Sequence, residues 1–270
     1  MRSRSLFTLK GRVNKMKRFT DITYSEIDTG AERLDMYLPD GEGFPVLLFF
    51  HGGGFTNCDK GDKEFPMLGE YFVSRGIGFI SANYRTYPNA RFPDYIEDGA
   101  RAVAWVRSHI GEYGGSGNMF VGGSSAGGHL SMLLCYDRRY LGAHGISPTD
   151  IRAFIHDAGQ PTTHFNVLKE DDIPRYRCVV GEKAPIYYVG MDKEYPPQQF
   201  FVADKDIPCR YEETMLLIST LRALKYDMDK VRLEYMEGYT HTEYLGKTDE
   251  NGESIFGERV YSFLTDMEVI

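Results

Sequence analysis

A short apolar run leading into a serine flanked by glycines most restricts the fold of this chain. Residues 119–130 read Met-Phe-Val-Gly-Gly-Ser-Ser-Ala-Gly-Gly-His-Leu, with Gly123-x-Ser125-x-Gly127 at the centre. The segment predicts a buried strand, a sharp turn and an amphipathic helix, which is the setting that a G-x-S-x-G nucleophile requires. Glycine is needed on both sides of the turn because a Cβ there would crowd the neighbouring backbone. We therefore predict that the Ser125 hydroxyl lies at the carboxyl edge of a sheet.

Two other interpretations of this segment fit less well. Ser124 is the competing serine, but it would need Gly122 and Ala126 as its flanking pair, and Ala126 carries a Cβ. A phosphate-binding loop would need the Lys of a Walker A motif or the spacing G-x-G-x-x-G, and the segment has neither.

The rest of the chain alternates short apolar runs with longer amphipathic stretches. Predicted strands cover residues 46–50, 78–82, 119–121, 151–155, 200–203 and 231–236. Predicted helices cover residues 63–74, 95–113, 126–136, 212–225 and 254–267. Residues 20–27 and 33–38 predict an opening antiparallel hairpin. This order predicts an α/β fold with a mostly parallel central sheet and helices on both faces.

The 270 residues suit a single domain of this class. We expect the basic residues 1–18 to form a flexible tail, with Met16 as an alternative start, and residues 19–270 to form the domain. Residues 160–196 contain four prolines and are too long for a tight connection. This segment is predicted to form either a lid or pocket wall, or a peripheral helical insertion.

Composition and charge exclude several classes of function. The net charge of −8 argues against nucleic acid or an anionic membrane as a partner. No run approaches the apolar length of a membrane span or a signal-peptide core. The four cysteines show no zinc-ligand spacing. We therefore expect a cytoplasmic protein without a metal, and the sequence leaves its oligomeric state open.

A glycine-rich loop follows the first predicted buried strand, in the sequence His51-Gly52-Gly53-Gly54-Phe55. Such a loop can turn backbone N–H groups inward, where no side chain fills the space. The N–H groups of Gly53, Gly54 and Ala126 are the predicted oxyanion hole. His51 is expected to orient this loop rather than to act as a base.

A general base and an acid should follow the serine, in the chain order Ser, Asp, His. Of the seven histidines, only His241 follows the last predicted strand, so His241 is the predicted base and His129 and His156 are interpreted as structural. Asp204 and Asp206 both follow the strand 200–203. Asp206 is favoured because the acid usually lies on the loop beyond the strand, and Asp204 remains the alternative.

Several motifs together resemble the hormone-sensitive-lipase-like esterases of the α/β-hydrolase superfamily. They are the glycine loop 51–55, the serine segment 123–130, Gly238-x-x-His241, Asn83-Tyr84-Arg85 and Pro93–Asp98. The resemblance runs from about Val46 to His241. It implies the α/β-hydrolase fold and hydrolysis of carboxylic esters without a metal or organic cofactor. The spacing from Pro196-Pro197 to Asp206 also resembles the family and supports Asp206 as the acid.

Two differences from the family pattern make this chain more similar to the compact relatives within the family. Ser124 stands where many relatives have an acidic residue, and only about twenty residues precede the first predicted strand, so we expect little or no N-terminal cap. Compact relatives include acetyl esterases that act on acylated sugars and kynurenine formamidases. The leading prediction is a serine carboxylesterase for short, acetyl-type esters as small-molecule substrates, with Ser125, Asp206 and His241 as catalytic residues. An amidase such as a kynurenine formamidase, or a non-catalytic small-molecule receptor, remains the alternative.

Overall fold

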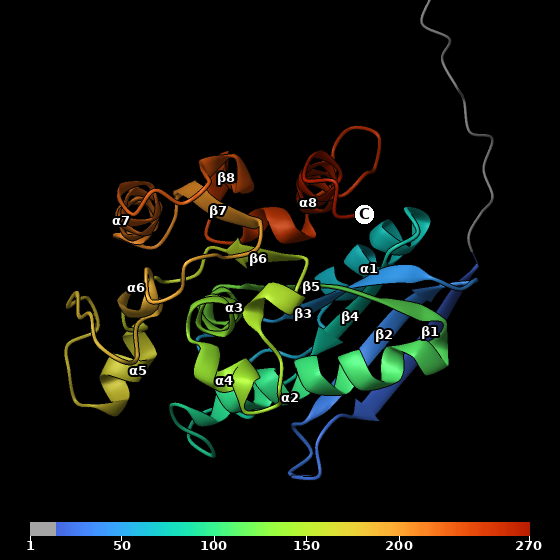
Figure 1. Ribbon diagram of the computed structural model, residues 1–270, viewed down its shortest axis with the longest axis horizontal. Coiled ribbons are helices and arrows are strands. Elements are labelled where there is room, and N and C mark those ends of the chain that lie inside the picture. Colours follow the sequence, from blue (N-terminus) through green and yellow to red (C-terminus); the bar gives the residue numbers. More distant parts are fainter. Residues whose placement is uncertain (1–14) are drawn as a thin grey trace, which may run out of the picture.

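The protein is described by a computed structural model, which covers residues 15–270. Its centre is one eight-stranded sheet in the order β1-β2-β4-β3-β5-β6-β7-β8 (Figure 1). The strands are β1 Met16–Thr23, β2 Arg33–Pro39, β3 Phe44–Phe50, β4 Gly78–Ala82, β5 Gly115–Ser124, β6 Ala153–Asp157, β7 Gln198–Lys205 and β8 Val231–Thr240.

The pairing of these strands confirms the predicted fold class. β1 pairs antiparallel with β2, and β2 pairs antiparallel with β4. Every other neighbouring pair, from β4 across to β8, is parallel. The opening hairpin and the mostly parallel sheet are therefore both present.

Helices cover both faces of the sheet (Figure 1). They are α1 Glu64–Ser74, α2 Asp94–His109, α3 Ala126–Tyr136, α4 Arg138–Gly142, α5 Phe165–Glu170, α6 Pro185–Tyr188, α7 Arg210–Ala223 and α8 Ile255–Asp266. Successive side chains of a strand point to opposite faces, so β3 contributes Val46, Leu48 and Phe50 to one core cluster and Leu47 and Phe49 to the other. The first cluster packs under α2, α3 and α7, and the second packs under α1 and α8.

The predicted N-terminal tail, residues 1–18, extends too far along the chain. Residues 16–18 belong to β1, where Met16 pairs with Pro39 and Lys17 with Leu38. The pairing with β2 orders these residues although they carry the basic charge that suggested a tail. The rest of the predicted tail, residues 1–14, lies outside the described residues.

Residues 160–196 connect β6 to β7 and hold the short helices α5 and α6. The start of this connection is buried, from Gln160 to His164, whereas much of the remainder is exposed. The connection lies beside α3, α4 and α7 in Figure 1.

Candidate active site

Ser125 occupies the turn between β5 and α3. Its backbone has φ 55° and ψ −110°, a conformation that a residue with a Cβ rarely adopts. Its N–H donates a hydrogen bond of 2.7 Å to the carbonyl of Asp157, at the end of β6. This bond joins the strained turn to the neighbouring strand.

The glycines around the turn have no space for a side chain. A Cβ at Gly123 would lie 2.3 Å from the Gly127 carbonyl oxygen, and a Cβ at Gly127 would lie 2.2 Å from the Phe50 carbonyl oxygen. Both contacts are to backbone, which cannot move aside as a flexible side chain can. The close approach of β3, β5 and α3 thus requires the glycines of the motif.

His241 directly follows β8, and its ring lies between two of the other predicted site residues. Its Nε2 is 2.8 Å from Ser125 Oγ, and its Nδ1 is 2.6 Å from Asp206 Oδ1. The structure therefore brings Ser125, His241 and Asp206 into one chain of hydrogen bonds, although they are far apart in the sequence.

Asp206 lies on the loop after β7 and is held by three donors. Besides His241, the backbone N–H groups of Ala203 and Ile207 donate to its carboxylate, at 3.1 and 2.7 Å. Burial alone would raise the pKa of Asp206, but the bond and charge of His241 and these two N–H groups outweigh it and lower the pKa below its ordinary value. Asp204, the alternative acid, is exposed on β7.

The glycine loop after β3 reaches the serine. A Cβ at Gly52 would be 3.2 Å from the Cβ of Ser125, and one at Gly53, where φ is 83°, would be 2.1 Å from the Asn57 carbonyl oxygen. Gly52 and Gly53 line a cavity of about 120 Å³ together with Ser125 and His241. Of the predicted oxyanion-hole residues, Gly53 therefore faces this cavity.

The other two predicted donors are placed differently. Gly54, with φ 62°, directs its carbonyl oxygen to the side-chain amide of Asn166, which donates to it. Ala126 is the first residue of α3, where a backbone N–H has no acceptor within the helix. This bond uses the carbonyl oxygen of Gly54 and not its N–H, so the donor role of Gly54 stays a prediction, as does that of Ala126.

The remaining histidines near the site are bound to other groups. The Nδ1 of His129 lies 2.7 Å from the Gln160 carbonyl oxygen, and the Nδ1 of His156 lies 2.8 Å from Ser131 Oγ. Burial lowers the pKa of His129 to about 4 and that of His156 to about 3. His51 stacks on Tyr84 at a ring distance of 4.4 Å, and the Tyr84 hydroxyl donates to the His51 carbonyl.

Asp157 and Tyr244 support the site and were not singled out from the sequence. The Tyr244 hydroxyl donates to Asp157 Oδ1, and both residues are buried. Burial raises the pKa of Asp157 to about 6. Because Tyr244 lies three residues after His241, this contact ties the histidine loop to β6. The two residues are 87 positions apart, and no local pattern connects them.

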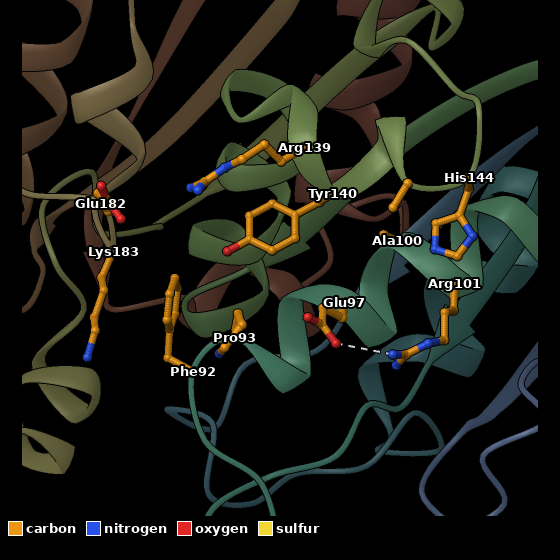
Figure 2. A pocket seen from close by; sticks show the side chains of 11 residues that line it. Phe92, Pro93, Glu97, Ala100, Arg101, Arg139, Tyr140, His144, Glu182 and Lys183 are labelled. Atoms are coloured by element: carbon orange, nitrogen blue, oxygen red, sulfur yellow. Dashed lines mark hydrogen bonds and ion pairs between the residues drawn. The ribbon is translucent and has the colours of Figure 1, made fainter.

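A larger cavity of about 570 Å³ lies away from these residues, between α2, α4 and residues 182–183 (Figure 2). Its basic side chains are Arg101, Arg139 and Lys183. Each forms an ion pair, Arg101 with Glu97 and Asp98, Arg139 with Asp137, and Lys183 with Asp171. Neither Ser125 nor His241 lines this cavity.

Residues 15–270 contain neither a candidate metal site nor a candidate membrane-spanning helix. Within these residues, no group of three or more His, Cys, Asp or Glu side chains could hold a metal ion. No helix in the same part of the chain has both the length and the apolar character to cross a membrane.

Sequence comparisons connect the first half of the chain to known esterases. Residues 34–144, which include the glycine loop and Ser125, match the family model BD-FAE. The probable carboxylic ester hydrolase LipM of Mycobacterium tuberculosis is 39% identical over 118 residues, which are 42% of this chain and 27% of LipM. The gibberellin receptor GID1 of Oryza sativa is 37% identical over 98 residues, which are 34% of this chain and 27% of the receptor. The matched segments thus span about a quarter of these relatives.

Structural comparisons extend over nearly the whole chain and establish the fold. A truncated carbohydrate esterase from gut microbiota superposes with a TM-score of 0.75 and 17% identity, covering 96% of this chain and 99% of that one. Esterase B of Lactobacillus rhamnosis gives a TM-score of 0.75 and 15% identity, covering 96% and 89%. At these identities the likeness concerns the fold. The protein therefore has the α/β-hydrolase fold, and its first half is similar to known carboxylic ester hydrolases.

Proposed function

We propose that this protein is a serine hydrolase that cleaves carboxylic esters with short acyl groups. The observation that carries the proposal is the hydrogen-bonded chain from Ser125 Oγ through His241 to Asp206. A serine hydroxyl is a weak nucleophile until an adjacent base accepts its proton, and the base must itself be held in one tautomer. The three side chains meet both requirements.

Each of the three residues has a proposed role. Ser125 Oγ attacks the acyl carbonyl while His241 Nε2 accepts its proton, and His241 then returns the proton to the leaving alcohol. Asp206 accepts from His241 Nδ1–H and stabilises the imidazolium. The N–H groups of Gly53, Gly54 and Ala126 are the proposed donors to the oxyanion, and water completes the cycle by cleaving the acyl-enzyme.

A small acyl group is favoured by the size of the cavity at the serine. About 120 Å³ lies between the glycine loop and His241, which accommodates an acetyl group more readily than a long chain. The carbohydrate esterase with the same fold supports acetylated sugars as the substrate class to test first.

Hydrolysis of p-nitrophenyl esters of increasing acyl length tests the proposal. We expect kcat/KM to be highest for acetate and to fall for octanoate, and Ser125→Ala to lower the rate by at least about 10³-fold. Arg222→Gln, at the exposed end of α7, is the matched control and should retain the rate. Unchanged hydrolysis by Ser125→Ala would show that another group carries the activity.

The pH dependence of the same reaction tests the role of His241. A protonated imidazole cannot accept the Ser125 proton, so kcat/KM should fall toward acid pH. A rate that does not fall toward acid pH would contradict a histidine base.

A non-catalytic receptor is the second candidate, because part of the chain is similar to the gibberellin receptor GID1. Binding of a small molecule without turnover would require that Ser125 be unreactive. Reaction of Ser125 with a fluorophosphonate therefore separates the two functions.

A further inference from the structure

Arg210 is a buried arginine close in sequence to Asp206, and no group of residues 15–270 accepts a hydrogen bond from its Nε or Nη1. It is the first residue of α7, four positions after Asp206, and is 2% exposed. Its Nε and Nη1 are sealed from solvent and make no hydrogen bond, and no carboxylate of the described residues lies within 4.0 Å of its guanidinium. A buried charge without a hydrogen-bonded partner is costly, and buried donors are nearly always satisfied. This side chain therefore calls for a ligand.

A second unsatisfied donor lies in the same region. His164 Nδ1 accepts a hydrogen bond of 3.2 Å from the Asn166 N–H, which places the ring proton on Nε2. That Nε2 is buried and has no partner among the residues that the structure describes. Burial holds the pKa of His164 well below its ordinary value, with smaller contributions from His129 and Arg210, so His164 stays a neutral donor.

The nearby carboxylates are committed to other partners. Asp206 holds His241, Asp157 accepts from Tyr244, and Glu213 accepts from Thr162 Oγ1 at 2.9 Å. Their fields act on Arg210, but none of them contacts its guanidinium. Arg210 and His164 thus keep N–H donors that no group of residues 15–270 accepts.

We propose that Arg210, with His164, forms a subsite beside the triad that binds a carboxylate group of the substrate. The guanidinium fork holds its N–H donors in fixed directions, and a charge-assisted bond from Nε or Nη1 to a carboxylate oxygen is about twice as strong as a neutral one. The inference rests on the proposed hydrolase function and narrows its substrates to esters or amides that carry a carboxylate near the scissile bond. The carboxylate takes no part in bond cleavage and serves to orient the substrate.

A matched pair of substrates tests this subsite through specificity. The 4-carboxyphenyl and 4-carbamoylphenyl esters of acetic acid have the same shape and differ in charge. We expect the wild type to prefer the carboxylate, and Arg210→Gln to lower the ratio of the two kcat/KM values about tenfold or more. Arg210→Lys keeps the charge without the fork and should give an intermediate ratio, whereas Arg222→Gln should leave the ratio unchanged.

Direct binding tests the subsite without catalysis. The Ser125→Ala protein, with Arg210 intact, is titrated by calorimetry with benzoate, benzamide and inorganic phosphate. Benzoate should bind at least about tenfold more tightly than benzamide, and adding Arg210→Gln should remove the difference. If Arg210→Gln does not fold, the comparison of benzoate with benzamide on the Ser125→Ala protein still tests the subsite, because that protein retains the arginine.

Several results would overturn the subsite. In the ester experiment, these results are a wild type that does not prefer the carboxylate ester and a preference that is unchanged in Arg210→Gln. Equal slowing of both esters in Arg210→Gln would also overturn it, because Arg210 would then act only by holding Asp206 in place. In the binding experiment, the contrary results are no preference for benzoate over benzamide, and binding of phosphate without binding of benzoate. If the wild type hydrolyses neither ester, the proposed function fails, and preferential binding of benzoate still establishes the carboxylate subsite.

Discussion

The two cavities differ in how the polar side chains that line them are bonded, and their volumes do not indicate this difference. The larger, about 570 Å³, is lined by basic side chains that are each neutralised by a carboxylate. The smaller, about 120 Å³, is lined by Ser125 and His241, whose side chains are hydrogen-bonded to each other. The backbone of Ser125 has the strained φ of 55°. Local strain and convergent polar groups mark a candidate reactive site better than volume does.

The largest expected effect concerns the acid of the smaller cavity. Asp206→Asn should lower kcat by about 10³–10⁴-fold in p-nitrophenyl acetate hydrolysis, because an amide does not stabilise the imidazolium or hold the required tautomer. Asp204→Asn, two residues away and exposed, should change kcat by less than about twofold. If both variants lose activity equally, the hydrogen bond to His241 does not identify the acid.

The close packing under the serine can be tested through stability. Gly127→Ala should lower the free energy of unfolding by about 1–3 kcal/mol in urea titrations, because its Cβ would meet the Phe50 carbonyl oxygen at 2.2 Å. Gly142→Ala in α4 meets no atom within 4 Å and is the control, which should not lose stability. Equal stability of the two variants would show that the turn is less tightly packed than the structure indicates.

The buried carboxyl of Asp157 should make a smaller, pH-dependent contribution. Its pKa is raised from 3.8 to about 6, so the folded protein binds this proton more tightly than the unfolded chain. The stability owed to this group is therefore lost as the pH rises from about 4 to 6. Asp157→Asn should be more stable than the wild type at pH 8 by on the order of 2 kcal/mol, and this advantage should shrink at pH 4. A difference that is constant with pH would contradict burial of the charge.

The smallest expected effect lies in the larger cavity. Arg139→Gln removes a charge from that cavity and should change kcat/KM for p-nitrophenyl acetate by less than about twofold. A loss comparable to that of Asp206→Asn would mean that the larger cavity contributes to the reaction. The reactive site would then not be limited to the cavity at Ser125.

Features set by local chemistry could be predicted from the sequence. The turn at Ser125 depends on two glycines within five residues, and the parallel sheet depends on the spacing of apolar runs. The choice between Asp204 and Asp206 could not be made from the strand alone. The pairing of β7 with β8 shifts register between Ala203 and Lys205, and sequence does not reveal such an irregularity.

Features that depend on distant contacts could not be predicted. Asp157 and Tyr244 become a pair only when β6 and the loop after β8 come together. Arg210 looks like an ordinary helix residue in the sequence, and its burial depends on how α7 packs. Residues 16–18 carry charges typical of a tail, yet pairing with β2 makes them part of the sheet.

Covalent labelling of the intact protein by a fluorophosphonate, followed by peptide mapping, tests the central assignment most directly. The proposed triad predicts one adduct, on Ser125, which is absent from Ser125→Ala and forms much more slowly in His241→Ala. An adduct on Ser124, undiminished labelling of Ser125→Ala, or a wild type that does not react would contradict Ser125 as the nucleophile.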